Sequence, residues 1–448
     1  MLKQLLVSIF ICATFQVIAQ ISTNSPYSSK GLGDTRFYGN AYLSSLGGSS
    51  AAVFDSTQVN LFNPSSYSLV AQQLPLFSIG ITHQEKRFRG AAGESEGRFS
   101  GITHMSLVIP FAKRLGLAFG LKPFSRVGYE VNDFALVNGD SIFYDYTGNG
   151  SVQEFLLGFS GTVVDREKHQ LTFGVNGKHY FGGISNIRRT YERINGLEVG
   201  GQESRALRAS SFGAEIGVNY QWNVNSAHRL ILGGVFRPEL NLGFNQSNTR
   251  FFYSNYANPA VYDTLVPYEP AEGEIRLPQE TKLGLTYVFT PDSISRNSKL
   301  PMLMLTAEYS LTQWSRYQES FGENIDNTEF LDANSLRVGL EYAPHRNSSD
   351  RSAYVNFLDK FRYRVGAYRT MMPFEVNDDQ VLNQGLTAGI GIPLVINRAV
   401  SSVNFGFNYG TLGDNNSAGS LQEEYFGVNF GINIAPSYDR WFRKYKLD

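Results

Sequence analysis

Five charged residues in the second half of the chain could bind an anionic ligand or one another. In each strand-like segment they take the parity opposite to the apolar residues. They are Glu308, Arg337, Glu341, Arg362 and Arg364. A guanidinium is planar and binds a carboxylate through two parallel N–H groups, so an arginine of this set could hold a ligand carboxylate. The same charges could instead form an internal salt-bridge lattice that fixes one part of the chain to another.

Other chemistry finds little support in the residues. The six histidines show no HExxH spacing, and no GxSxG sequence occurs. The only cysteine is Cys12, which excludes a disulfide. We therefore predict that the protein is not an enzyme, with no catalytic residue, no metal site and no cofactor. Lys and Arg total 39 against 40 for Asp and Glu, so no basic field favours nucleic acid as a partner.

The charged residues must be positioned by strands, because the chain alternates with a period of two along most of its length. Near the C-terminus one parity carries apolar residues and the other carries only Gly and Asn. The apolar set is Phe426, Val428, Phe430, Ile432 and Ile434. A strand with one oily and one small or polar face suits a wall between lipid and water. About fourteen such segments occur, which predicts an all-β, transmembrane antiparallel β-barrel of about 14 strands.

The connections between the segments give a second test, because bacterial barrels alternate long outer loops with short periplasmic turns. The predicted connections largely alternate in this way. The longest predicted outer loops in the first two thirds of the chain are Gln84–Gly97, Asn132–Gly150, Gly182–Glu203 and Gly243–Arg276. A soluble β-sandwich is the alternative to a barrel, but it rarely needs so many long segments with Gly and Asn on one side.

The N-terminus predicts export. An apolar run follows Lys3, and Val17 and Ala19 occupy the small-residue positions of a signal-peptidase site. We predict a cleaved signal peptide over residues 1–19, a barrel over 73–434 and a periplasmic tail over 435–448. Such a chain would lie in the cell outer membrane, with membrane lipids as partners.

Residues 20–72, between the leader and the barrel, show no sustained alternation and are rich in Gly, Ser and Asn. A segment of this length cannot bury a core alone, so we predict an N-terminal hatch that folds inside the lumen of the barrel. Its stretch from Gly47 to Ser66 carries a motif of Asp55, Phe62, Asn63 and Pro64. This motif resembles the hatch of the long-chain fatty-acid transporter family of outer-membrane proteins. Ser65 stands where that family usually has Ala.

Two later stretches, LRVGLEYAP from Leu336 and FRYRVGAYR from Phe361, resemble the late paired strands of the same family. The resemblance implies an outer-membrane channel for the passive uptake of hydrophobic, fatty-acid-like small molecules. It also implies a ligand pocket above the hatch and a lateral opening in the wall. Pro123 and Phe124 interrupt the third segment and are the candidates for that opening, because proline cannot donate to a strand ladder. A simple bulge at the outer end of the strand is the alternative.

The C-terminal tail leaves a second functional hypothesis open. The chain continues past its last predicted strand with Trp441, Phe442 and Tyr445 among several basic residues. Such a stretch could lie against the membrane interface or dock to another protein. The alternative function is therefore a non-transporting barrel subunit or adaptor of an outer-membrane secretion or assembly complex.

Overall fold

The fold was analysed in a computed structural model of the 448-residue chain. The described residues are 25–36, 39–70, 75–90, 93–291, 299–322, 324–326, 329–347, 350, 352, 354–396, 399–414 and 420–435. The predicted signal peptide and residues 436–448 of the predicted tail lie outside the described residues.

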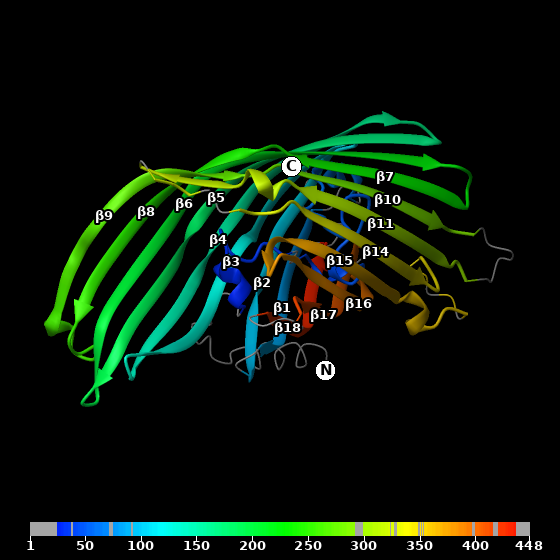
Figure 1. The fold of residues 1–448 in the computed structure, drawn as a ribbon. Helices are drawn as coiled ribbons and strands as arrows, with labels where there is room; N and C mark the ends of the chain where they lie inside the picture. Colours follow the sequence, from blue (N-terminus) through cyan, green and yellow to red (C-terminus); the bar gives the residue numbers. More distant parts are fainter. Residues whose placement is uncertain are drawn as a thin grey trace, which may run out of the picture.

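Eighteen strands form a single sheet in the part of the chain that the structure describes, and fourteen of them close into a ring (Figure 1). The ring strands in the first half of the chain are β1 (Leu76–Gly90), β2 (Gly93–Ala112), β3 (Leu115–Val137), β4 (Asp140–Asp165), β5 (His169–Ile194), β6 (Leu197–Asn223) and β7 (His228–Arg237). Those in the second half are β10 (Glu280–Phe289), β11 (Met302–Thr312), β14 (Ala333–Ala343), β15 (Arg362–Val376), β16 (Asp379–Ile396), β17 (Ala399–Leu412) and β18 (Leu421–Ile434). Neighbours pair antiparallel throughout, and β18 closes the ring on β1 from Phe77↔Ile434 to Gly90↔Leu421. The predicted barrel is confirmed.

Apolar side chains cover the outside of the ring, as the alternation predicted. Phe173 is 49% exposed and Leu336 is 54% exposed, whereas their lumen-facing neighbours Thr172 and Ser335 are buried. At mid-height the outer surface of a membrane barrel meets lipid and not water, so exposed apolar residues of this kind contact hydrocarbon. We call the end with short connections the periplasmic end and the opposite end the outer end.

The outer end is much more extensively folded than predicted. Among the described residues, four strands lie outside the ring, namely β8 (Leu240–Tyr253), β9 (Tyr262–Leu277), β12 (Gln318–Phe321) and β13 (Asn324–Asp326). β7 pairs with the periplasmic part of β6, and β8 then takes over the outer part, from Gly200↔Tyr253 to Ala209↔Phe244. Figure 1 shows the long hairpins of β3 to β6 and of β8 and β9 sweeping beyond the ring.

The four predicted outer loops are therefore corrected to strand. Residues 84–97, 132–150 and 182–203 are mostly extensions of ring strands, and residues 243–276 lie mainly in β8 and β9. The polar composition of these stretches indicated loops, but outside the membrane both faces of a strand can meet water. Neither face then needs a run of apolar residues, so the period-two signal fades while the ladder continues.

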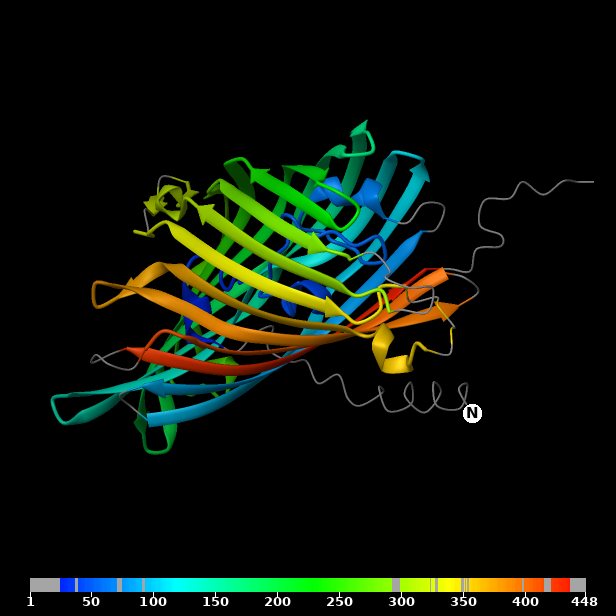
Figure 2. The same ribbon diagram turned by 90° about the vertical axis from the view of Figure 1, so that its right-hand side faces the viewer.

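The N-terminal segment folds inside the ring, where Figure 2 shows it in blue among the strands. Its elements are η1 (Pro26–Ser29), α2 (Ala41–Ser44) and η2 (Pro64–Leu69). Further short 3-10 helices lie in connections: η3 (Pro259–Val261), η4 (Trp314–Arg316) and η5 (Phe357–Lys360). Among the described residues, no helix has the length and apolarity required to cross a bilayer. Residues 25–70 are called the hatch below.

Glycines on the lumen face of the wall make room for the hatch. A Cβ at Gly233 would lie 1.9 Å from the carbonyl oxygen of Ala51, and one at Gly217 would lie 2.2 Å from Oδ1 of Asn63. Real Cβ contacts are essentially never this short, so at these positions the hatch can approach the wall this closely only because the wall residue has no side chain. The Gly-rich parity that predicted a watery lumen is thus in part a docking surface for the hatch.

Candidate functional site

Asn63 and Pro64 of the hatch motif hold the hatch against the wall inside the lumen. Oδ1 of Asn63 accepts a hydrogen bond from the backbone N–H of Ser65 at 3.0 Å and caps η2. Nδ2 of Asn63 donates to the carbonyl of Ala51 at 2.6 Å. Pro64 lies against Gly174, where a Cβ would be 2.3 Å from the Pro64 carbonyl carbon. These two residues therefore seat the hatch against the wall, and neither lines the outer cavity described below.

The five charges predicted to face the lumen are brought together and joined to the hatch. Arg337 pairs with Glu308 at 2.7 Å. Glu308 also accepts backbone N–H bonds from Ser50 and Ala51 of the hatch at 2.7 and 2.6 Å. Since a carboxylate on the wall holds two backbone donors of the hatch, this contact fixes the hatch to β11.

A second group of the same lattice surrounds Glu341, which is fully buried. Its carboxylate binds Arg362 at 2.8 Å and Arg364 at 2.6 Å. Arg362 also pairs with Asp55 of the hatch at 2.8 Å, and Arg364 lies over the ring of Tyr42. Burial raises the pKa of the Asp55 carboxyl, but Arg362 and the hydrogen bonds from Thr57 outweigh burial and hold that pKa below its usual value.

Phe62, the remaining motif residue, faces a cavity of about 230 Å³ on the outer side of the hatch. The ammonium groups of Lys122 and Lys282 lie 5.1 and 5.9 Å from the centre of its ring. Phe124 lines the same cavity and packs edge-on against Tyr180 at 5.0 Å. We call this space the outer cavity.

Charged residues from several strands form a chain of ion pairs in the wall of the outer cavity. Glu154 pairs with Lys122 and with Lys178, both at 3.3 Å, and Lys178 reaches Glu215 at 2.9 Å. A second set joins Glu280 to Arg237 and Lys282, each at 3.3 Å. These pairs join four cations to three glutamates, and Arg36 and Arg337 also line the cavity. Lys178 and Glu215 did not stand out in the sequence, but both occupy lumen parity, which is the signal that could have indicated them.

The wall changes at Pro123 and Phe124. The ladder between β2 and β3 runs from Ala112↔Leu115 to Met105↔Leu121, and in the described residues it goes no further. β3 continues to pair with β4 as far as Val137, through a bulge between Pro123 and Ser125. Two residues oppose one at a bulge, so the side-chain parity of β3 is reversed beyond it. The structure thus combines a bulge with a parting of β2 and β3, and we call this break the wall opening.

The first residues of the hatch lie along the free edge of β3 at the wall opening. Asp34 and Arg126 exchange two backbone hydrogen bonds of 2.7 and 3.0 Å, and the N–H of Ser25 donates to the carbonyl of Gly128 at 2.8 Å. The Arg126 side chain reaches across to β2, donating to the carbonyl of Ile102 at 2.7 Å. This hatch segment therefore occupies backbone positions that a neighbouring strand would otherwise fill.

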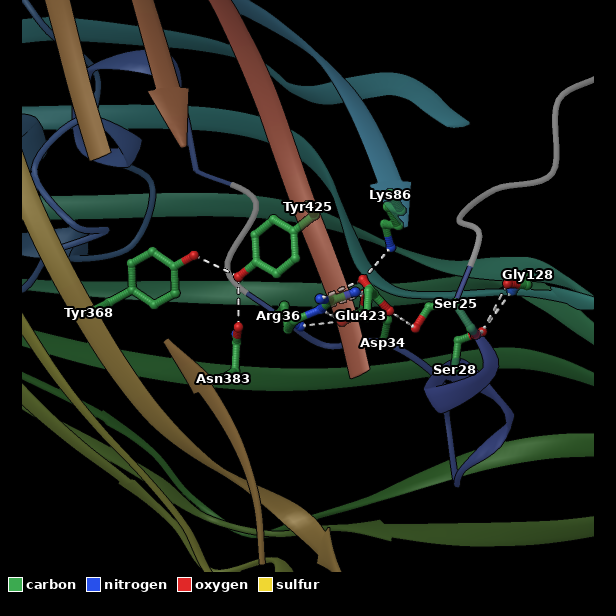
Figure 3. Close-up of polar contacts among 10 residues, drawn as sticks. All are labelled: Ser25, Ser28, Asp34, Arg36, Lys86, Gly128, Tyr368, Asn383, Glu423 and Tyr425. Atoms are coloured by element: carbon green, nitrogen blue, oxygen red, sulfur yellow. Dashed lines mark hydrogen bonds and ion pairs between the residues drawn. The ribbon is translucent and has the colours of Figure 1, made fainter. Parts of the chain in front are cut away.

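Buried charge holds the other side of the same hatch segment, as Figure 3 shows. Glu423 of β18 binds Lys86 at 2.9 Å and Arg36 at 3.1 Å, and it accepts a hydrogen bond from the Ser25 hydroxyl at 2.5 Å. Arg36 also pairs with Asp34 at 2.5 Å. Sequence reasoning missed this cluster because the residues are far apart in the chain and no local spacing connects them.

Comparison with known proteins decides the family. The profile of the BamG family matches residues 1–448. The chain belongs to the BamG family. No curated protein matches it. Among the described residues, no group of His, Cys, Asp and Glu is arranged to hold a metal ion.

Solved structures with the same fold are channels and transporters. The toluene transporter TodX of Pseudomonas putida has a TM-score of 0.54 at 15% identity, over 88% of this chain and 97% of its own. The Ralstonia pickettii toluene transporter TbuX has a TM-score of 0.53 at 13% identity, with the same coverage. The monoaromatic hydrocarbon channel CymD has a TM-score of 0.51 at 12% identity, over 89% and 97%. At these identities the similarity establishes the fold, which the BamG family member shares with outer-membrane channels.

Proposed function

We propose that this member of the BamG family is an outer-membrane channel for the passive uptake of hydrophobic small molecules. The observation that carries the proposal is the wall opening: the β2 and β3 ladder ends beside the outer cavity, which Pro123 and Phe124 line. A molecule in the cavity could leave sideways into the bilayer past the first hatch residues at the wall opening, while the rest of the hatch stays in place. Passage of this kind needs no cofactor and no source of energy. In this proposal the leader over residues 1–19 is cleaved on export.

The walls of the outer cavity favour a molecule with an apolar body and an anionic end. Phe62 and Phe124 offer aromatic surface, while the six cationic side chains of the lining outnumber its three glutamates. A fatty-acid-like ligand combines these two properties, since its carboxylate would find Lys122 or Lys282 beside the Phe62 ring. In this function Asp55, Asn63 and Pro64 hold the hatch as the floor of the cavity.

A crosslink across the wall opening tests the proposal. Cysteines at Ile102 and Arg126 would be joined by a short bis-maleimide in cells, and uptake of radiolabelled decanoate would be measured. We expect the crosslink to abolish uptake, because the side chain of Arg126 already reaches the Ile102 carbonyl across the break. The matched control joins Met105 to Leu121, the last regular pair of the ladder, and should leave uptake unchanged. Equal uptake in both crosslinked proteins would contradict lateral passage.

The exposed apolar tips of the outer hairpins favour the adaptor as a second candidate function. At the tip between β3 and β4, Phe134 is 63% exposed and Leu136 is 70% exposed, and Ile194 and Leu197 are exposed at the next tip. Apolar residues gathered in water are typical of surfaces that bind another protein. A partner of this kind would be an outer-membrane protein complex.

Co-purification tests the adaptor. The protein would be extracted from outer membranes in mild detergent, and the attached proteins and lipids identified by mass spectrometry. An adaptor should bring a larger complex that is lost when Phe134 and Leu136 are both replaced by Ser. A solitary barrel that retains a lipid-like molecule would support the channel and count against the adaptor.

A further inference from the structure

A second cavity of about 430 Å³ lies at the periplasmic end of the lumen, on the far side of the hatch from the outer cavity. Its lining includes Asp55 and Ser56 of the hatch, and Ser56 is exposed. The wall contributes residues near the periplasmic ends of several strands. The volume lies within the roughly 300 to 1,000 Å³ of small-molecule sites. We call this space the periplasmic cavity.

One side of the periplasmic cavity carries polar side chains that bind nothing in the described part of the chain. Gln170 of β5 and Gln221 of β6 are direct cross-strand partners, and neither amide makes a hydrogen bond there. Arg229 of β7 makes no hydrogen bond or ion pair with a described residue, and its Nε is buried without an acceptor. Asp55, which acts on Arg229 electrostatically, is already paired with Arg362 at 2.8 Å.

An apolar strip lies directly beside this guanidinium. Val288 is the cross-strand partner of Arg229 on β10, and Met304 is the partner of Val288 on β11. Both line the cavity and are buried, as is Ile231, two residues along β7 from Arg229. The cavity thus presents an unpaired cation and two amides next to hydrocarbon, whereas the carboxylates of its lining, Asp55 and Glu341, are already paired with Arg362.

This arrangement has an energetic cost that a ligand would offset. A buried guanidinium donor without an acceptor loses its hydration and gains nothing in return. A carboxylate, phosphate or sulfonate beside Arg229 would supply the buried Nε with a charge-assisted hydrogen bond. An alkyl chain on the same molecule would cover Ile231, Val288 and Met304, whereas a small inorganic anion would leave them bare.

We propose that the periplasmic cavity binds an anionic amphiphile, with its charged head on Arg229, Gln170 and Gln221 and its chain along the Val288 and Met304 strip. The site is separate from the outer cavity and goes beyond the proposed uptake, because binding here does not require passage through the wall opening.

A fluorescent label inside the cavity reports its occupation. Because Cys12 is the only cysteine, a Cys12→Ser, Ser56→Cys protein carries one reactive thiol, to which an environment-sensitive dye is attached. The full chain would be titrated in dodecyl maltoside with decanoate, decan-1-ol and inorganic phosphate. We expect decanoate to shift the emission and phosphate to have no effect at the same concentration. Arg229→Gln should weaken decanoate binding at least tenfold and leave the weaker binding of decanol unchanged.

Two further variants keep the test decisive. Arg114→Gln is the matched control, since Arg114 is half exposed near a periplasmic turn and pairs with Asp165 at 3.3 Å, and it should bind decanoate as the parent does. Gln221→Leu removes one amide without touching the charge and should cost a few-fold in affinity, so the proposal stays testable if Arg229→Gln does not fold.

The outcomes separate the alternatives. A label that does not respond to decanoate, or a response unchanged in Arg229→Gln, would overturn the site. Equal responses to phosphate and decanoate would overturn the amphiphile in favour of a small-anion site. In nanodiscs, a response to phosphatidylglycerol without decanoate would support the site and identify a lipid headgroup as its source of charge. The 102–126 crosslink should not alter this binding, so failure of uptake and failure of the site remain distinguishable.

Discussion

Glu341→Gln is the sharpest test of how the hatch is held in the barrel. The substitution keeps the shape of the side chain and removes its charge. Arg362 would still have Asp55 at 2.8 Å, but Arg364 would lose its carboxylate partner and keep only neutral acceptors, such as the amide oxygen of Asn404 at 3.0 Å, and the ring of Tyr42. Arg364 is 2% exposed, so water cannot replace the lost carboxylate.

The magnitude follows from that burial. Removing one member of a buried ion pair costs about 3 to 5 kcal/mol, because an uncompensated charge remains in the interior. We expect Glu341→Gln to lower the free energy of unfolding by about this amount. The matched control is Glu85→Gln, because the Glu85 side chain is 60% exposed and its pairs are long, with Arg98 at 3.8 Å. Its cost should be within about 1 kcal/mol.

Unfolding in urea would be followed by the different gel mobilities of folded and unfolded barrel, with both variants in the same detergent. Limited proteolysis of the hatch at zero urea would show whether the hatch loosens before the barrel unfolds. A Glu341→Gln protein whose unfolding free energy stays within about 1 kcal/mol of the parent would refute the reasoning, because the lattice would then contribute no more than an exposed pair.

Three other perturbations have defined outcomes. Gly233→Val should displace the hatch and make it sensitive to protease, since a Cβ at this position would lie 1.9 Å from the Ala51 carbonyl oxygen. Gly234→Ala is the control, because Gly234 faces outward and a Cβ there would have its nearest contact at 3.2 Å; this variant should behave as the parent. Because the folded-state pKa of Asp55 is lowered, its contribution to stability is present above its unfolded value near 3.8 and is lost as pH falls through the folded value. Unfolding midpoints should therefore fall more steeply below pH 4 in the parent than in Asp55→Asn, and parallel curves would contradict this. Phe124→Ala should weaken decanoate retention in the outer cavity by about tenfold, measured by equilibrium dialysis, and unchanged retention would place the ligand elsewhere.

The ring was predictable from the sequence because lipid imposes a strict rule on each strand. Along each ring strand every second residue faces hydrocarbon and must be apolar. Leu336, Val338 and Tyr342 therefore identify their strand without further information. Their lumen-facing neighbours Arg337 and Glu341 follow from the same parity. Strands that follow one another in the sequence of an up-and-down barrel are neighbours in the ring. The charges of successive segments could therefore be expected to lie together.

The rest could not be predicted because it depends on contacts between distant segments. Arg36 and Glu423 are separated by 387 residues, and nothing in either neighbourhood indicates the other. Likewise, β6 pairs with β7 near its periplasmic end and with β8 near its outer end. The position of this change depends on where the ladder between β6 and β7 ends, which composition does not encode. Arg229 follows the lumen parity, but its lack of a partner becomes visible only when the register of β7 with β6 and β10 is known.

The way the hatch is held bears on which route a ligand could take. Movement of the whole hatch would break the Asp55 contact with Arg362 and the two backbone bonds to Glu308, and would leave only the pairs within the wall, Arg362 with Glu341 and Arg337 with Glu308. Separation at the wall opening breaks the Arg126 bond to the Ile102 carbonyl and displaces the hatch segment bonded to β3 at Arg126 and Gly128, but β2 and β3 share no ladder there. The energetic difference favours a fixed hatch and a lateral route. A variant that frees the hatch should therefore lose stability without gaining uptake.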